Sequence, residues 1–540
     1  RDGEERFKSY FAINANKRLG FGFYIDYLYG RGLYQDQSTA FFNGGLFSSY
    51  RGDKYDMHFI FNNDNLKMAE NGGITDDRYI TNPLDMAEGK KEYSANEIPT
   101  RLSQIWNHNT SYHAFLTHRY NLGFYKEKQD SVDTDSVKIT QVFVPVTSFI
   151  HTLQVDLNNR KYISYDDAQN QKYFEHNYLG TDSIDKTKRT SIKNTIGIAL
   201  QEGFNKWAKA GLTAFLSYEY RNFALTDTTN IPGQRIINNY KESSLSIGGE
   251  LSKKQGKLLH YNILGELAIA GEDAGQFSVE GRGDLNLRLF GDTVRLDVNA
   301  FIKNQNPVFY FRHFQSKHYW WDNNDLSKIM RTRLEGKLSL DRWGTQLRAG
   351  VENIKNYTYL ANASIPVKDS EGNVTGFKNN AAVRQHSGNI QIFTAMLQQK
   401  LKVGIFHLDG EVAYQKSSEQ DILPLPELSA YGNLYMKFGL AKKVLQIEMG
   451  ADVRYFSKYY APDYSPVIGQ FYNQNPDDKI EIGAFPIVNV YANLHLKRTR
   501  FFIMMYHVNA GSGKSNYFLA PHYPINPRMI KFGLSWNFFD

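Results

Sequence analysis

The chain has 540 residues, no cysteine and a formal net charge of +7. The lack of cysteine excludes disulfide bonds, thiolate metal sites and a cysteine nucleophile, and so small a charge without a dense basic stripe does not indicate nucleic-acid binding. Aromatic residues make up 14% of the chain, yet its mean hydropathy is −0.51. This combination suits a wall that is apolar on one side and wet on the other.

The sequence contains neither a helical membrane span nor a boundary between domains. No apolar run reaches the length of about 18 residues that a spanning helix needs. The length would allow about three or four soluble domains, but no linker or low-complexity tract divides the chain, so we expect one domain over 1–540. The first residue, Arg1, is not an initiator methionine, so we expect a mature or truncated chain.

Apolar and polar residues alternate in long segments along the chain, as at 211–221, 293–303, 405–415 and 444–455. These segments have roughly 10–16 residues, whereas a typical soluble strand has about 5–6 and a tilted membrane strand needs about 9–11. The length of the segments therefore favours membrane-crossing strands over a soluble sandwich.

Short turns alternate with longer polar connections, as in outer-membrane barrels. The segment 125–138 is an exception, since it reads as a long connection on the short-turn side. The predicted long loops are 70–104, 161–188, 225–238, 306–327, 361–387, 418–427 and 458–484.

The predicted fold is all-β: one large antiparallel transmembrane barrel with short periplasmic turns and long extracellular loops. We count about 21 strand segments, and bacterial barrels normally have an even number. We therefore expect at least one further strand upstream of Arg1, giving about 22 in a range of roughly 18 to 24. No separate plug domain is visible, so folded-in loops such as 70–104 and 361–387 are the expected constriction.

The last strand divides its residues between two faces. Lys531, Gly533 and Ser535 are small or polar, which fits a lumen, and the alternate positions are apolar and fit lipid. The barrel-assembly machinery is the expected partner of this strand. The predicted lipid-facing residues are Ile530, Phe532, Leu534, Trp536 and Phe538.

Four segments between 275 and 352 place charges of both signs on their polar face. Their functional interpretation is a charged ladder that screens solutes in a pore, with a mild preference for anions. The alternative is a network of ion pairs that stiffens the wall. The predicted lumen-lining residues are Glu280, Arg282, Asp284, Arg288, Arg295, Asp297, Arg331, Arg333, Glu335, Lys337, Arg348 and Glu352.

Other motifs are weaker, and we expect no metal site, cofactor or catalytic residue. Acidic spacing at 129–137 could hold Ca²⁺ but lacks the glycine and distal glutamate of an EF-hand. The segment 62–65, together with Glu70 and 75–77, could form an oxygen-rich loop site for a cation, although ordinary solvated loop residues are the favoured interpretation.

Two further segments attract attention without carrying a function. Paired tryptophans at 318–325 are expected to be exposed on a loop, where they could stack on a sugar, contact a partner or anchor the chain at an interface. The segment 511–515 resembles a phosphate-binding loop but lacks its first glycine and a following helix.

Seven stretches of the chain carry a family resemblance: 27–37, 69–77, 151–162, 423–437, 450–474, 482–502 and 516–540. Together they resemble the putative porin family of Bacteroidota outer membranes. The resemblance covers nearly the whole chain and is densest toward its end. It implies an outer-membrane β-barrel of a Gram-negative cell and supplies no substrate or catalytic motif.

The favoured function is a porin that forms a polar aqueous channel for passive diffusion of small hydrophilic solutes. An accessory or scaffold barrel in a larger complex for protein insertion, secretion or surface-lipoprotein handling is the alternative. A TonB-dependent transporter would need a plug domain, and a barrel enzyme would need a triad that His507 and Asp540 do not supply. The expected partners are outer-membrane lipid and lipopolysaccharide, and other outer-membrane proteins or surface lipoproteins in the alternative.

Overall fold

A computed structural model of the chain describes residues 3–133, 136–165, 167–205, 208–228, 235–289, 291–513 and 515–536. In these residues, 21 strands form one sheet in which each strand pairs antiparallel with its neighbours in the sequence. The first ten strands of the sheet are β1 (Glu4–Asn14), β2 (Leu19–Gly30), β3 (Thr39–Arg51), β4 (Tyr55–Ala69), β5 (Ile105–Asp133), β6 (Ser136–Ser164), β7 (Ile184–Leu200), β8 (Gly211–Thr228), β9 (Arg235–Lys253) and β10 (Leu259–Gly271).

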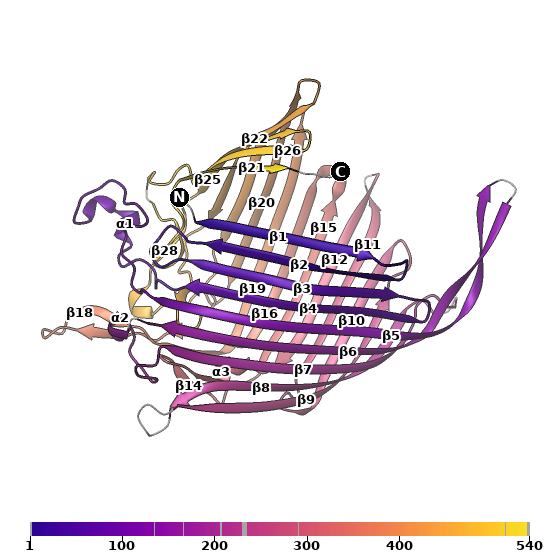
Figure 1. Cartoon of the computed structure of the whole chain (residues 1–540), viewed down its shortest axis with the longest axis horizontal. Coiled ribbons are helices and arrows are strands. Elements are labelled where there is room, and N and C mark those ends of the chain that lie inside the picture. Colours follow the sequence, from indigo (N-terminus) through magenta and orange to yellow (C-terminus); the bar gives the residue numbers. More distant parts are fainter. Residues whose placement is uncertain are drawn as a thin grey trace.

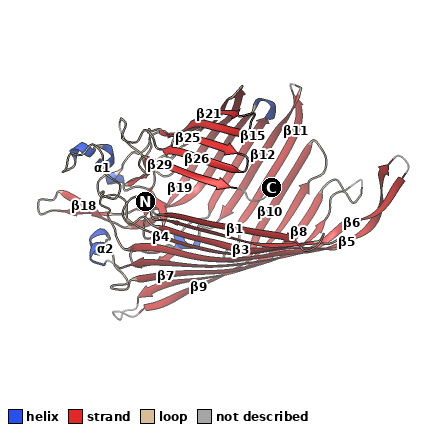
Figure 2. Ribbon diagram, turned by 45° about the horizontal axis from the view of Figure 1, so that its top comes forward, coloured by secondary structure: helices blue, strands red, loops and turns tan. Residues whose placement is uncertain are grey.

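The sheet curls round so that its first strands lie opposite its later ones (Figures 1 and 2). Among the described residues, β1 pairs only with β2 and β29 only with β26, so these two strands end the sheet. They run in the same direction because the sheet has 21 antiparallel strands, an odd number. The remaining eleven strands are β11 (Phe277–Leu289), β12 (Asp292–Gln305), β15 (Ile329–Leu340), β16 (Thr345–Asn362), β19 (Ala381–Val403), β20 (Phe406–Ser417), β21 (Leu428–Leu440), β22 (Leu445–Phe456), β25 (Ile487–Leu496), β26 (Thr499–Tyr506) and β29 (Met529–Trp536).

The small elements lie in the connections between these strands. In the described ranges no helix is long and apolar enough to cross a membrane. The short strands pair as hairpins: β13 (His313–Gln315) with β14 (Trp320–Asp322), β17 (Ile365–Lys368) with β18 (Val374–Lys378), β23 (Asp463–Ser465) with β24 (Gln470–Tyr472), and β27 (Phe518–Ala520) with β28 (Tyr523–Pro524). The helices are α1 (Arg78–Thr81), α2 (Asp167–Tyr173) and α3 (Phe309–Arg312), and the 3-10 turns are η1 (Pro83–Asp85), η2 (Asp341–Trp343) and η3 (Pro476–Asp478).

Short and long connections separate to opposite rims of the sheet, as the sequence predicts. The predicted loop 418–427 matches the connection between β20 and β21. Three predicted loops are too long. For 161–188, strand β6 continues to Ser164 and β7 begins at Ile184. For 225–238, strand β8 continues to Thr228 and β9 begins at Arg235, and for 361–387, strand β19 already begins at Ala381. Polar residues led to these errors, although their backbones pair in register and their side chains can face water.

The predicted connection at 125–138 is wrong, since most of it belongs to the strands β5 and β6. These strands have 29 residues each and pair from Ile105↔Ser164 to Asp133↔Ser136. Figures 1 and 2 show the hairpin projecting beyond the short-turn rim. Its second strand is rich in β-branched valine and isoleucine, which favour extended backbone.

Six long connections pack together at the other rim, and we call them the cap. They join β4 to β5, β6 to β7, β12 to β15, β16 to β19, β22 to β25 and β26 to β29. One apolar cluster of the cap includes Ile74, Phe485 and Phe518, and a second includes Tyr319 and Val467. The β22–β25 connection contributes to both clusters and so links opposite parts of the rim.

Candidate functional site

The twelve residues of the predicted ladder share one face of four neighbouring strands. The register aligns Asp297 with Asp284 on one side and with Lys337 on the other. Lys337 in turn lies opposite Arg348. Successive side chains of a strand point to opposite faces, so this register puts the charged residues together and the apolar ones on the other face.

Most of these charges form ion pairs within the ladder. Asp297 accepts from Arg295 Nε at 2.8 Å and lies 3.1 Å from Lys337 Nζ. Lys303 Nζ lies 2.6 Å from Glu280. Partly exposed pairs of this kind stabilise a protein by only about 0–1 kcal/mol each, so the ion pairs of the ladder add little to the stability of the wall.

A second group of pairs spans β15 and β16. Arg331 Nε donates to Glu352 at 2.8 Å, and Arg333 pairs with Glu335. Arg348 Nε lies 3.9 Å from the same Glu335 carboxylate. One acidic side chain thus faces two basic ones, which leaves positive charge incompletely balanced.

The charged face forms an open cavity of about 380 Å³, which Asp297, Lys337 and Arg348 help to line. Arg282 and Asp284 line it, and Asp284 lies 2.8 Å from Nδ1 of His260. Arg288 lies near the short-turn rim, opposite Thr293. The twelve ladder residues comprise seven basic and five acidic side chains, so the ladder carries a mild positive surplus.

The opposite face of the same strands is apolar and exposed. Val279, Val298, Leu334 and Val351 lie on it with between 37% and 54% of their surfaces exposed. The residues of β29 that are predicted to face outward are exposed in the same way. Between 56% and 81% of the surface of each is exposed, for Ile530, Phe532, Leu534 and Trp536. Phe538 lies outside the described residues. The wall therefore has one charged face and one apolar face.

The hairpin β23–β24 crosses from one part of the rim to another. At one end, Asn473 N donates to Leu360 O and Asn362 N donates to Asn473 O, both at 2.8 Å, which attaches the hairpin to the end of β16. At the other end, Tyr464 Oη donates to Glu70 Oε1 at 2.9 Å. Nine strands of the sheet separate β4 from β16, so the hairpin spans the mouth of the curled sheet.

The attachment beside β4 is a buried polar cluster. Glu70 Oε1 also accepts from Asn107 Nδ2 at 2.6 Å, and the same amide nitrogen donates to Pro466 O at 2.7 Å. Burial raises the pKa of Glu70 to about 7, although Asn107, Tyr464 and the nearby Arg160 oppose the increase. Burial thus favours the protonated form of Glu70 in this cluster, whereas the hydrogen bonds that it accepts favour the carboxylate.

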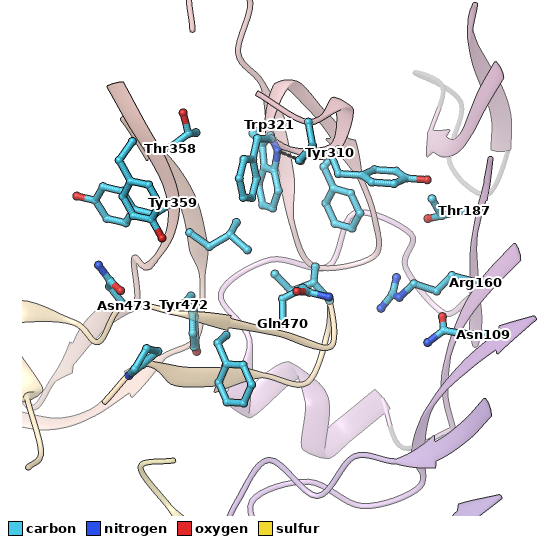
Figure 3. A pocket seen from close by; sticks show the side chains of 18 of the residues that line it. Asn109, Arg160, Thr187, Tyr310, Trp321, Thr358, Tyr359, Gln470, Tyr472 and Asn473 are labelled. Atoms are coloured by element: carbon cyan, nitrogen blue, oxygen red, sulfur yellow. Dashed lines mark hydrogen bonds between the residues drawn. The ribbon is translucent and has the colours of Figure 1, made fainter. Parts of the chain in front are cut away.

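A cavity of about 730 Å³ lies beneath this hairpin (Figure 3). The strands β5, β6 and β7 provide a polar wall, and the connections after β12, β20 and β22 provide an aromatic and apolar one. Trp321 Nε1 donates to Tyr310 O at 2.9 Å, which holds the β13–β14 hairpin against α3 (Figure 3). The volume is typical of a small-molecule site.

A β-bulge brings two tyrosines of β16 to this cavity. The register with β19 shifts between Lys355 and Tyr357, where Asn356 has a φ of 59°. A bulge redirects the side chains that follow it. Tyr357 and Tyr359 consequently line the cavity, with their ring planes 9° apart and their centroids separated by 5.9 Å.

The two predicted cation sites, at 62–65 and at 129–137, have different outcomes in the structure. Residues 62–65 belong to strand β4 rather than a loop, so the proposed oxygen-rich loop site is wrong there. Asn65 Oδ1 instead lies 3.0 Å from His108 Nε2, on the face of the sheet opposite to the side chains of Asn109 and Ser111. Part of the segment 129–137 lies outside the described residues. Elsewhere in the described ranges, no group of three or more potential metal-binding side chains occurs.

The paired tryptophans at 318–325 separate in the structure. Trp320 is 48% exposed, but Trp321 is buried, as are His318 and Tyr319. The prediction that both indoles are exposed is therefore half wrong, because the β13–β14 hairpin alternates its faces. The segment 511–515, of which residue 514 is not described, lies in the β26–β29 connection and precedes no described helix.

The cavity as a whole could not be predicted from the sequence. Its residues come from seven strands or connections far apart in the chain, and only folding brings them together. One local hint is Trp321, in the segment 318–325 that could stack on a sugar. Another is the aromatic and amide-rich stretch at 470–475, which forms β24 and its continuation.

A family model described as a putative porin matches residues 1–540. No curated protein matches the chain. Among solved structures, the siderophore receptor PirA from Acinetobacter baumannii is similar with a TM-score of 0.62 and 9% identity, over 99% of this chain and 77% of that one.

Two other solved structures share this architecture. A mutant of the ferric enterobactin receptor PfeA from Pseudomonas aeruginosa has a TM-score of 0.60 and 12% identity, over 98% of this chain and 77% of that one. The copper transporter OprC has a TM-score of 0.60 and 9% identity, over 98% and 78%. At such low identity these similarities concern the fold alone.

Proposed function

Because the chain belongs to the putative porin family, we propose that it is an outer-membrane β-barrel of a Gram-negative cell, and that it forms a polar channel for passive diffusion of small hydrophilic solutes. The channel is mildly selective for anions and has no catalytic activity. Short turns face the periplasm and the cap faces the exterior.

The observation that carries this proposal is the division of the wall into two faces. An exposed apolar face that includes Val298 and Leu334 has no place in water, and lipid is the solvent that suits it. The charged face that includes Arg333 and Lys337 needs water or ion partners. Lipid outside and water inside satisfy both faces at once.

Closure of the sheet follows from the same reasoning. An open edge with unpaired backbone groups is not tolerated in lipid. Since β1 and β29 run in the same direction, antiparallel closure takes one further strand between them, for a barrel of about 22 strands. The outer face contacts lipid and lipopolysaccharide, and the strand β29 is the segment that the barrel-assembly machinery recognises.

Single-channel recording of the full-length protein in planar bilayers under a KCl gradient tests the proposal. We expect steps of stable size and a reversal potential displaced toward that of chloride. Combining Arg282→Gln with Arg348→Gln should keep the steps and remove the anion preference. Silence from correctly folded protein would contradict an open passage.

The β17–β18 hairpin favours a second candidate, an accessory barrel in a larger assembly for protein insertion, secretion or surface-lipoprotein handling. The hairpin projects from the cap rim (Figure 1), and Ile365, Val367 and Val374 on it are 38–53% exposed. Apolar side chains on a projecting hairpin suit a protein partner. Purification in mild detergent, with and without residues 366–377, distinguishes the candidates: the accessory function requires a stoichiometric partner that the deletion releases.

A further inference from the structure

We propose that the 730 Å³ cavity beneath the β23–β24 hairpin is a binding site for a short neutral saccharide. This inference deepens the proposed function by naming a class of solute. It rests on the proposed channel in one respect only, that the cavity lies on the path of a solute through the barrel. Binding itself depends on the cavity alone and can be measured without transport.

The first element of the site is its flat aromatic surface. Tyr357 and Tyr359 present parallel rings, and both are only partly buried. Phe471, from the hairpin above, is 61% exposed and also lines the cavity. Phe314 and Trp321 also line the cavity, and their rings stack on each other with centroids 4.9 Å apart. Aromatic faces carry negative charge density that attracts polarised hydrogens, such as the C–H groups on one face of a pyranose ring.

The second element is a wall of amides and hydroxyls. Ser111 Oγ donates to Asn158 Oδ1 at 2.9 Å in this wall, and Asn109 lies beside them. Gln470 and Asn473 come from the opposite side (Figure 3). Amides and hydroxyls both donate and accept hydrogen bonds, which is what a ligand with many hydroxyl groups requires.

The third element is the charge of the cavity. Among the described residues that line it, Arg160 is the only charged one, and none is acidic. Arg160 Nη2 donates to Asn107 Oδ1 at 2.6 Å, and its buried Nη1 has no hydrogen-bond partner in the described residues. Figure 3 shows the side chain extending from β6 toward the cavity. Arg160 therefore gives the polar wall a positive character that favours the oxygen atoms of hydroxyl groups.

These three elements together select the ligand class. A metal cation would need oxygen ligands with negative charge, which the lining does not supply. A polyanion would need more than one basic group. A fully apolar ligand would leave the amides of the polar wall without partners, at a cost of about 1–3 kcal/mol for each buried group. A neutral saccharide has an apolar ring face for the tyrosines and hydroxyls for the amides.

Isothermal titration of the full-length protein in a detergent without a sugar headgroup tests this inference. The probes are maltotriose, cellotriose and xylotriose, with trigalacturonate and decanoate as charged and apolar comparisons. We expect at least one neutral trisaccharide to bind more tightly than either comparison. Combining Tyr357→Ala with Tyr359→Ala should weaken that binding about tenfold, as expected for the loss of two aromatic contacts.

The control is Tyr414→Ala, because Tyr414 lies on the outer face of β20 and is 39% exposed. It should bind as the unchanged protein does. No binding of any neutral trisaccharide, equal binding by the double variant, or tighter binding of trigalacturonate or decanoate would overturn the inference. Conductance of the same preparation separates the two proposals: channels without binding refute only the saccharide site, and binding without channels refutes only the porin.

Discussion

Replacing Val298 by arginine should destabilise the inserted protein far more than the same change at Asn299, one residue along the strand. Val298 lies near the middle of β12 on the apolar face, between Gly283 and Gly336 of the neighbouring strands. The glycines offer no side chain that could shield or pair the new charge. Arginine facing lipid at mid-depth costs about 2–4 kcal/mol, or roughly 30- to 900-fold in the folding equilibrium.

Asn299 gives the matched control, because it lies on the charged face between Arg282 and Glu335. An arginine at position 299 can form an ion pair with the Glu335 carboxylate but is repelled by Arg282. The net change in the free energy of unfolding should therefore stay within about 1 kcal/mol. Val298→Leu controls for side-chain volume and should be neutral.

Folding into phosphatidylcholine vesicles, titrated with guanidinium and followed by gel mobility without heating, measures the difference. The free energy of unfolding should fall by 2 kcal/mol or more for Val298→Arg alone, within the range of about 2–4 kcal/mol given above. Equal losses for both arginine variants, or the larger loss at Asn299, would refute the assignment of the faces.

Three further outcomes are expected. In the last strand, Leu534→Arg should hinder membrane insertion more than Ser535→Arg. The cost should be smaller than at mid-depth, because Leu534 pairs with Phe501 close to the short-turn rim. Gel mobility after folding measures the folded fraction of each variant, and equal fractions would contradict the assignment of the two faces. The pKa of Glu70 is raised from an ordinary 4.5 to about 7 in the folded protein. The free energy by which Glu70 stabilises cap attachment is therefore complete below pH 4.5 and is lost as the pH rises through 7. Hydrogen exchange of the β22–β25 connection should therefore quicken from pH 5 to 8 after correction for intrinsic rates, and Glu70→Gln should remove that dependence; an unchanged slope would contradict the role of Glu70. Glu335→Gln, which removes one carboxylate facing two arginines, should strengthen anion selectivity in bilayers, and a shift toward cations would contradict the ladder as the selective element.

The wall could be predicted from the sequence because a strand repeats every two residues. That period fixes which residues share a face, so the ladder from Glu280 to Glu352 could be placed before any strand pairing was known. The same period placed Leu534 outward and Ser535 inward in the last strand.

Connections were harder to predict, because polar composition does not distinguish a loop from a strand in contact with water. Residues 62–65 resemble a cation-binding loop, yet they pair along β4, where their side chains find partners such as Thr110 and His108. The segment 125–138 misled for the same reason, since its polar residues continue two paired strands.

The cavity could not be predicted, because its contacts join residues far apart in the chain and because one bulge reverses the alternation. Glu70 meets Tyr464 only in the folded protein. Continuing the alternation from Arg348 and Glu352 without the bulge at Asn356 would place Tyr357 and Tyr359 on the apolar face.

Thiol labelling tests the central claim, that the charged face lines water and the apolar face meets lipid. The chain has no cysteine, so Arg333→Cys and Leu334→Cys each introduce a single thiol at neighbouring positions of β15. In protein reconstituted into vesicles, a charged, membrane-impermeant maleimide should modify the thiol at position 333 rapidly and leave the one at 334 unmodified until the membrane is dissolved. Equal labelling at both positions, or labelling at 334 alone, would contradict an aqueous lumen behind the charged ladder.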